Sequence, residues 1–219
     1  MSGASLVIGS TGLIGKKLIF ELAKKDSEVI AISRRSISNL PENIALLVIN
    51  FKDFLENGIL PPCDHIYICL GTTIKKAGSQ VEFKKIDFDY SVFFARKARE
   101  AGATKISLVS SVGANPYAKN FYLKTKGEVE EEIKKIDFQS INIFRPSLLL
   151  GHREEVRFLE KIGQNLSSFI NPCLIGSLRK YRGIESSNVA YCMANCEQND
   201  GIKYLYFDDF NKNFERENQ

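Results

Sequence analysis

Short apolar runs alternate with longer amphipathic stretches along most of this 219-residue chain. Runs of four to six apolar residues predict buried strands, and stretches with apolar side chains at helical spacing predict helices. This alternation is typical of an α/β protein, a doubly wound parallel sheet with helices on both faces. The predicted strands are residues 4–8, 29–32, 44–49, 65–70, 105–109 and 140–144, and the predicted helices are 12–25, 81–100 and 117–135.

The pattern loosens after Pro146. Residues 154–166 and 185–196 predict helices, and 201–207 predict a last strand. We expect residues 1–219 to form a single domain, because no linker rich in Gly, Ser or Pro interrupts them. Residues from about 151 to 200 are then expected to form a small C-terminal cap that lines the substrate pocket.

Two charged stretches are expected to face solvent. Glu130 and Lys134 are four residues apart and predict a solvated helix face. The polar tail 211–219 is expected to be frayed.

Composition excludes several classes of protein. The net charge is +4 with acids and bases interspersed, so we expect no nucleic-acid partner. No apolar run reaches the ~18 residues of a membrane span. The chain enters its first strand almost at once, which leaves no room for a cleaved targeting segment and predicts a cytoplasmic location.

The five cysteines are irregularly spaced and are expected to be reduced, mostly buried thiols. Cys192 and Cys196 stand one helical turn apart, which could suggest a metal ligand pair. With two histidines in the chain and no second cysteine pair, we expect no metal site.

A glycine-rich loop joins the first strand to the first helix, at residues 9–15. Gly9 permits a tight turn, Gly12 removes a side chain where a pyrophosphate would approach, and Gly15 allows close helix packing. The helix N-terminus then directs free N–H groups at phosphate oxygens. A glycine-rich turn of another α/β protein is the alternative, but the strand–loop–helix context favours dinucleotide binding.

The end of the second strand predicts which dinucleotide binds. An acid that would grip the ribose hydroxyls of NAD is missing there, and Ser33, Arg34 and Arg35 follow instead. Guanidinium groups bind a 2′-phosphate through charge-assisted hydrogen bonds. We therefore expect NADP(H) rather than NAD(H), although two solvated surface arginines would give the same pattern.

A Tyr–Lys pair follows the fifth strand. Tyr122 and Lys126 share a helix face, just beyond Ser110 and Ser111 at the strand end. An adjacent ammonium favours the phenolate form, so Tyr122 could exchange a proton with a substrate carbonyl or hydroxyl. Lys126 could hold the nicotinamide ribose, and a serine could stabilise charge on the substrate oxygen. Simple core packing is the alternative for the tyrosine.

Together these segments resemble the atypical short-chain dehydrogenase/reductases, most closely the branch of Tat-interacting-protein-like oxidoreductases and their bacterial relatives. The resemblance is most specific at residues 122–130, and it departs from the pattern at Ser147, where a relative can carry glycine. The other segments that carry it are residues 9–15, 69–73, 76–78, 110–114, 144–151, 179–182, 184 and 189–190.

The resemblance implies a Rossmann fold, NADP(H) binding and catalysis by Tyr122 with Lys126. By analogy with epimerase-like enzymes it favours Ser111 over Ser110 as the assisting serine. The residues expected to contact the cofactor are Gly9, Ser10, Thr11, Gly12, Leu13, Ile14, Gly15, Arg34, Arg35, Leu70, Gly71, Tyr122 and Lys126.

Two classes of function follow from these residues. The first is an NADP(H)-dependent oxidoreductase acting on a small carbonyl or alcohol, or a close variant, an epimerase or dehydratase that keeps its cofactor bound. The second is an NADPH-binding regulatory or interaction protein with little turnover. His152, Arg153 and Arg157 could meet an anionic substrate or be solvated loop charges. The helices 81–100 and 117–135 could pair across a homodimer.

Overall fold

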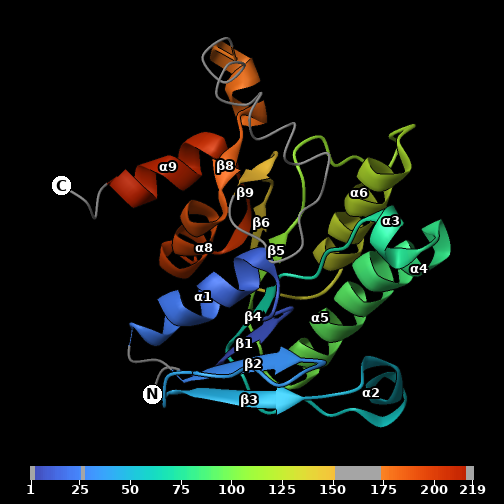
Figure 1. Cartoon of the computed structure of the whole chain (residues 1–219), viewed down its shortest axis with the longest axis vertical. Coiled ribbons are helices and arrows are strands. Elements are labelled where there is room, and N and C mark those ends of the chain that lie inside the picture. Colours follow the sequence, from blue (N-terminus) through green and yellow to red (C-terminus); the bar gives the residue numbers. More distant parts are fainter. Residues whose placement is uncertain (1–2, 26–27, 151–173, 216–219) are drawn as a thin grey trace.

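The computed structural model describes residues 3–25, 28–150 and 174–215. Within these residues, seven parallel strands form one sheet in the order β3-β2-β1-β4-β5-β6-β9 (Figure 1). The order runs outward in both directions from β1 and β4, which is the doubly wound arrangement predicted from the sequence. The strands are β1 (Ser5–Ile8), β2 (Val29–Ser33), β3 (Ile44–Val48), β4 (His65–Ile68), β5 (Lys105–Val109), β6 (Ser140–Phe144) and β9 (Gly201–Leu205).

The register places the carboxyl ends of neighbouring strands at one edge of the sheet. Ile8 of β1 is paired with Ile32 of β2 on one side and with Ile68 of β4 on the other. Ile68 is in turn paired with Leu108 of β5. The loops that leave these four strands therefore start close together, and in doubly wound sheets this edge is where ligands bind.

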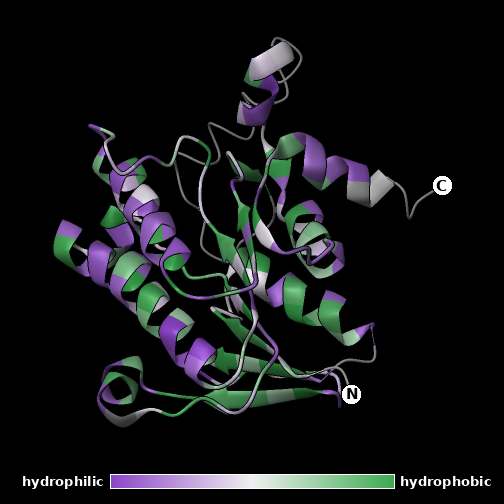
Figure 2. Ribbon diagram, turned by 180° about the vertical axis from the view of Figure 1, so that it is seen from behind, coloured by the Kyte–Doolittle hydropathy of each residue, from purple (hydrophilic) through white to green (hydrophobic). Residues whose placement is uncertain are grey.

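Helices cover both faces of the sheet (Figure 1). On one face α1 (Leu13–Ala23) packs against α8 (Ser186–Asn195), which packs against α9 (Phe207–Glu215). On the other face α5 (Tyr90–Glu100) lies beside α6 (Phe121–Lys134), and α2 (Phe51–Asn57) packs on α5 through the Phe51 and Phe94 rings. The central strands β1 and β4 are buried along their whole length and are mostly apolar, because both of their faces are covered (Figure 2).

Two hydrophobic clusters fill the spaces between the sheet and its helices. One contains Phe94 and Ile133 from α5 and α6, packed on strand residues such as Ile66. The other contains Leu18 of α1 and Val189 of α8. The sheet separates the two clusters, so each amphipathic helix buries one apolar stripe against it.

The helix predicted over residues 81–100 is interrupted. It consists of α4 (Gln80–Lys84), a π-helical turn η1 (Lys85–Asp89) and α5. In the turn, the Tyr90 N–H bonds to the Lys85 carbonyl, five residues back. Turns of this kind recur at functional sites, because the extra residue re-aims the side chains around it.

The helix predicted from residue 117 begins at Phe121. The Asn120 side chain accepts a hydrogen bond from the Leu123 N–H and caps the first turn, a typical start signal. Tyr117 lies in the preceding loop and is 91% exposed. Its aromatic ring therefore does not extend the buried face of α6.

Several short elements were not predicted from the sequence. The prediction that the tail 211–219 is frayed is wrong as far as Glu215, because α9 extends to that residue. The predicted helix 154–166 lies outside the described residues. Across the described part of the chain, no helix has both the length and the apolar character to span a membrane. The unpredicted elements are α2, α3 (Ile74–Ala77), β7 (Leu149–Leu150), the 3₁₀ helix η3 (Gly176–Tyr181), β8 (Ile184–Glu185) and α9.

Candidate cofactor-binding and catalytic site

The glycine loop has the conformation that its sequence predicts. Gly9 adopts a φ of +82°, and a Cβ there would lie 2.7 Å from the Cys69 carbonyl oxygen of the neighbouring strand. A Cβ on Gly15 would collide with the Gly9 carbonyl. Gly12 lies at the tip, where its N–H bonds to the Gly9 carbonyl at 2.9 Å. Two of the three glycines are therefore required by the fold itself.

Helix α1 begins directly after this loop with an open N-terminus. Gly12 occupies the cap position, no side chain caps the helix, and its first turn carries no acid. The Ser10 hydroxyl is fully buried and donates to the Ile32 carbonyl at 3.0 Å, and the Ile14 side chain lies in the core. Ser10 and Ile14 can therefore offer a ligand only their backbone. The loop fits a dinucleotide, whose phosphates bind uncapped helix N–H groups.

The loop after β2 presents two arginines. The Ser33 hydroxyl is buried and accepts the Arg35 N–H at 3.1 Å, which fixes the turn. Arg34 and Arg35 are exposed, and the Arg34 guanidinium lies 5.8 Å from the Phe51 ring centroid. The turn therefore holds two cations at the carboxyl edge of the sheet, and residues 33–41 contain no acid.

The two serines after β5 have different surroundings. Ser110 is 4% exposed, and its hydroxyl donates to the Glu130 carboxylate of α6. Glu130 is itself bound by the Arg145 guanidinium, whose Nε lies 2.9 Å from Oε1. Ser111 is partly exposed and makes only a long contact of 3.3 Å to the neighbouring Val112 carbonyl. Ser110 is thus committed to a structural network, whereas the Ser111 hydroxyl has no strong partner among the described residues.

The same network corrects one prediction. Glu130 was expected on a solvated helix face with Lys134, but it is 1% exposed and paired with Arg145. Lys134 instead pairs with Glu131 at 2.8 Å. The charge pattern of the helix did not reveal this, because Arg145, the partner of Glu130, comes from the end of another strand.

Lys126 of α6 is buried and ion-paired. Its Nζ lies 2.7 Å from Oδ1 of Asp87 in the π-helical turn η1, and the two residues are 5% and 1% exposed. The other Asp87 oxygen accepts the Thr72 N–H at 2.9 Å, in the loop after β4. Burial alone would lower the pKa of Lys126, but Asp87, with smaller contributions from Tyr122 and Glu130, outweighs it and raises that pKa.

Tyr122 lies one turn before Lys126 and is partly exposed. Its ring is 5.8 Å from that of Phe83, a fully buried residue of α4. The tyrosine is therefore packed on one side and accessible on the other. Gly71, which borders the same region, is exposed, and Asp87 Oδ1 is the nearest atom, at 4.0 Å, to a Cβ placed there.

Asp87 belongs to the candidate site, but it was not predicted from the sequence. A signal was available, because Asp87 lies on the apolar stripe of its helix. Phe83, Tyr90, Phe94 and Ala98 flank it at spacings of three and four residues, and all are buried. A charged residue on such a stripe conflicts with the pattern around it, and such conflicts are expected at functional sites.

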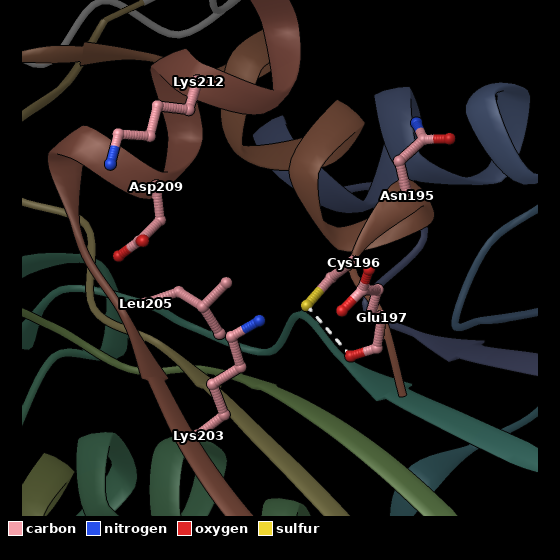
Figure 3. A pocket seen from close by; sticks show the side chains of 7 residues that line it. All are labelled: Asn195, Cys196, Glu197, Lys203, Leu205, Asp209 and Lys212. Carbon is pink, nitrogen blue, oxygen red and sulfur yellow. Dashed lines mark hydrogen bonds between the residues drawn. The ribbon is translucent and has the colours of Figure 1, made fainter. Parts of the chain in front are cut away.

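A hollow that none of these residues lines lies between α8, β9 and α9 (Figure 3). Burial, reinforced by Asp209 and Glu197 against Lys203, raises the pKa of the Cys196 thiol there, so it stays protonated. Among the described residues, no group of three or more His, Cys, Asp or Glu side chains could hold a metal ion. None of the expected site residues lines this hollow, which is bordered by Asn195, Cys196, Glu197, Lys203, Leu205, Asp209 and Lys212.

His152, Arg153 and Arg157 lie outside the described residues, as do residues 151–173 of the predicted cap. The described part of the cap is joined to the sheet through Ser147, the position of the family departure. The Ser147 hydroxyl donates to the Arg182 carbonyl, and the Ile184 N–H bonds to the Leu148 carbonyl at 2.9 Å. Ser147 therefore has a structural role here.

Comparison with known proteins agrees with this geometry. Protein FMP52, mitochondrial, of Lodderomyces elongisporus is 36% identical over 167 residues, covering 71% of this chain and 70% of that protein. Protein HTATIP2 of Rattus norvegicus is 34% identical over 157 residues, covering 69% of this chain and 64% of that protein. These relatives confirm the resemblance to the Tat-interacting-protein branch.

Solved structures confirm the fold. A putative NAD-dependent epimerase/dehydratase from Bacillus halodurans superimposes with a TM-score of 0.64 at 21% identity, over 92% of both chains. The human epimerase family protein SDR39U1, solved with NADPH, gives 0.63 at 16% identity, over 93% of this chain and 74% of that one. Both support the Rossmann arrangement.

The relatives overturn one expectation. Several are named as mitochondrial proteins, including those of Candida albicans and Saccharomyces cerevisiae, which contradicts the predicted cytoplasmic location. The prediction assumed that a targeting signal must precede the first strand. Such signals are addresses read by receptors, and a composition-based reading can miss them.

The sequence model of the NAD dependent epimerase/dehydratase family matches residues 5–213, from β1 into α9. That span includes the glycine loop, both serines, the Tyr–Lys pair and Asp87. The chain belongs to the NAD dependent epimerase/dehydratase family, with a Rossmann-type fold.

Proposed function

We propose that this protein is an NADP(H)-dependent oxidoreductase of short-chain dehydrogenase/reductase type that acts on a small carbonyl or alcohol. The observation that carries the proposal is the position of Tyr122 and Lys126. They share a face of α6. Lys126 pairs with Asp87, which also bonds to the loop after β4. Strand β4 lies beside β1, the strand that precedes the glycine loop. This is the place where a nicotinamide ring lies in doubly wound sheets.

The residues have distinct roles in this proposal. A reduced nicotinamide dinucleotide, held by the loop of residues 9–15 and by Arg34 and Arg35, would supply the hydride for a substrate carbonyl carbon. The Tyr122 hydroxyl would then give its proton to the carbonyl oxygen. The Tyr122 phenolate regains its proton from water. Ser111 donates a hydrogen bond to the substrate oxygen as negative charge develops on it. Lys126 orients the tyrosine and the ribose of the cofactor.

The preference for NADP(H) rests on Arg34 and Arg35, two exposed cations in a turn without an acid. Replacing both arginines with alanine should narrow the preference for NADPH over NADH by about 1–3 kcal/mol, the range of hydrogen bonds to charged groups. Calorimetric titration of each nucleotide measures the change. Arg96→Ala is a matched control, because Arg96 is an exposed arginine on α5, and it should leave both affinities unchanged.

The first experiment is the same titration on the wild-type protein, followed by a panel of small carbonyl compounds. Tight NADPH binding with turnover supports the oxidoreductase. Tight NADPH binding without turnover on any compound favours the alternative, an NADPH-binding regulatory or interaction protein. If neither nucleotide binds, the loop is structural and both functions are wrong.

We also propose that two copies pair through α5 and α6. A groove on these helices is lined by Phe88, Val92 and Phe93, with Asp89, Arg96 and Glu132 at its margin. Arg96 and Glu132 lie 3.4 Å apart and carry opposite charges, so the same surface on a second copy, rotated by a twofold axis, would be complementary to it.

The names of the fungal relatives lead us to propose a mitochondrial location. Fractionation of cells that express the untagged protein, followed by detection with an antibody, tests this. Recovery with mitochondrial markers is the expected result, and recovery only in the soluble fraction would contradict it.

A further inference from the structure

Asp87 and Lys126 form a buried ion pair. The Asp87 side chain is 0% exposed and the Lys126 side chain is 7% exposed. Such a pair is a poor source of stability, because desolvation of both charges offsets their attraction. An apolar pair of similar size would hold η1 against α6 as well. The placement of a charge pair beside the proposed catalytic tyrosine therefore calls for a role in the chemistry.

The backbone around Asp87 is adapted to hold this carboxylate. Asp87 lies at the centre of the π-helical turn Lys85–Asp89, which separates the helices α4 and α5. One carboxylate oxygen forms the ion pair with Lys126. The other accepts a hydrogen bond from the backbone N–H of Thr72, the residue after Gly71. One side chain thus connects the loop after β4 to the helix that carries Tyr122.

We propose that Asp87 is a positioning residue that fixes and neutralises Lys126, so that Tyr122 keeps its proton and the site is set for reduction of a carbonyl. The inference rests on the proposed function and deepens it by assigning a direction. An unpaired ammonium next to Tyr122 would favour the phenolate, the form that accepts a proton from an alcohol. With the ammonium paired, the hydroxyl remains a proton donor.

Other charges near the pair are either engaged with other partners or accessible to solvent. Glu130, one turn beyond Lys126, is held by Arg145 and by Ser110. Lys84 of α4 pairs with Glu128 at 3.1 Å. On η1, Asp89 is exposed in the groove with Arg96 on α5, and Lys85 is partly exposed. Asp87 is therefore the anion in direct contact with the lysine, and it is the group to change.

Ionisation of Tyr122 can be measured without substrate or cofactor. The ultraviolet absorbance of tyrosinate is followed as pH rises, and the Tyr122→Phe trace is subtracted to isolate one of the eight tyrosines. In Asp87→Asn, which keeps the shape of the side chain and removes its charge, the Tyr122 midpoint should fall by about one pH unit, the effect of an uncompensated neighbouring charge. Circular dichroism over the same range verifies the fold.

Two further variants sharpen the test. Asp89→Asn makes the same chemical change two residues away at an exposed position, and its midpoint should equal that of the wild type. The double variant Asp87→Asn with Lys126→Gln removes both charges, so the midpoint should return toward the wild-type value. The double variant also stands in if Asp87→Asn alone does not fold, since it leaves no unpaired buried charge. If Asp87→Asn alone does not fold and the double-variant midpoint lies far from the wild-type value, the proposal is wrong.

An unchanged Tyr122 midpoint in folded Asp87→Asn and also in Asp87→Asn with Lys126→Arg, whose cation cannot lose its proton, would overturn the proposal and leave Asp87 with a purely structural role. Failure of the proposed function is recognised separately. It appears as an absence of NADPH binding by the wild-type protein, whatever the tyrosine titration shows.

Discussion

At the residue scale, neighbouring side chains of the same type have different tasks. Ser110 and Ser111 are adjacent, yet one is fixed to the buried Glu130 and the other is free to meet a ligand. The sequence could place both serines at the strand end, but only the contact with α6 distinguishes them.

The two serines make a matched pair of substitutions. Ser110→Ala removes a donor from a buried carboxylate and should lower the free energy of unfolding by about 1–3 kcal/mol. Ser111→Ala should leave that free energy within about 0.5 kcal/mol. It should instead lower kcat by about 100-fold on a carbonyl that the protein reduces. Urea unfolding and steady-state kinetics measure the two effects, and the reverse assignment would remove Ser111 from the mechanism.

His65 should make the stability of the protein depend on pH. Burial, assisted by the charge of Lys105, lowers its pKa from 6.5 to about 3, and its Nε2 lies 3.0 Å from the Ser107 hydroxyl. The folded protein therefore holds a neutral imidazole, which the unfolded chain protonates below pH 6.5. Its contribution to stability is complete above that pH and is lost toward pH 3, at about 1.4 kcal/mol per pH unit.

Urea unfolding between pH 7 and pH 4 (about the range over which His65 differs between the two states) tests this. His65→Asn cannot titrate, so its stability should fall less steeply than that of the wild type across the range. Carboxylates contribute equally to both proteins and cancel in the comparison. Equal slopes would mean that His65 is protonated in the folded state.

At the element scale, the long strands and helices follow from their apolar periodicity, and the short elements do not. The strands β1 to β6 and helix α1 lie within one or two residues of their predicted bounds. The π-helical turn was not predicted, because its single extra residue leaves the stripe around Asp87 almost unchanged. Helices such as α3, with four residues, are too short to produce a periodic signal.

Contacts between elements can outweigh the helix propensity of a residue, as at Gly127 in α6. Gly127 lies inside α6, where alanine would ordinarily stabilise a helix by up to ~1 kcal/mol. A Cβ at this position, however, would collide with the backbone of Asn115 and Pro116, in the loop that follows Ser111. The glycine thus allows that loop to rest on the helix, next to Lys126.

Gly127→Ala should therefore destabilise the protein by about 1–3 kcal/mol, the cost of overpacking. Thermal unfolding followed by circular dichroism measures the loss. Lys124→Ala, at an exposed position on the same helix, serves as the control and should change stability by less than about 0.5 kcal/mol. If Gly127→Ala were as stable as the wild type, the loop that contains Asn115 and Pro116 would be able to move away from α6 without a loss of stability.

At the scale of the whole molecule, a doubly wound parallel sheet follows from the alternation of strands and helices, whereas its strand order and the use of its surfaces do not. The carboxyl edge of the sheet was predicted to gather the glycine loop, the arginines and the Tyr–Lys pair, and the register explains why these loops start together. The Asp87–Lys126 and Glu130–Arg145 pairs were not predicted, because each joins segments that only the fold brings into contact.

The proposed dimer is a prediction at this scale. Wild-type protein should have about twice the 24.7 kDa mass of one chain in size-exclusion chromatography with light scattering. Arg96→Glu places like charges beside Glu132 on both copies and should yield a monomer, because repulsion across a twofold axis occurs at two equivalent places. Lys97→Glu makes the same charge change on the next residue, which does not line the groove, and should remain dimeric. A monomeric wild type would mean that the groove between α5 and α6 has another use, and an Arg96→Glu dimer would place the interface on a different face.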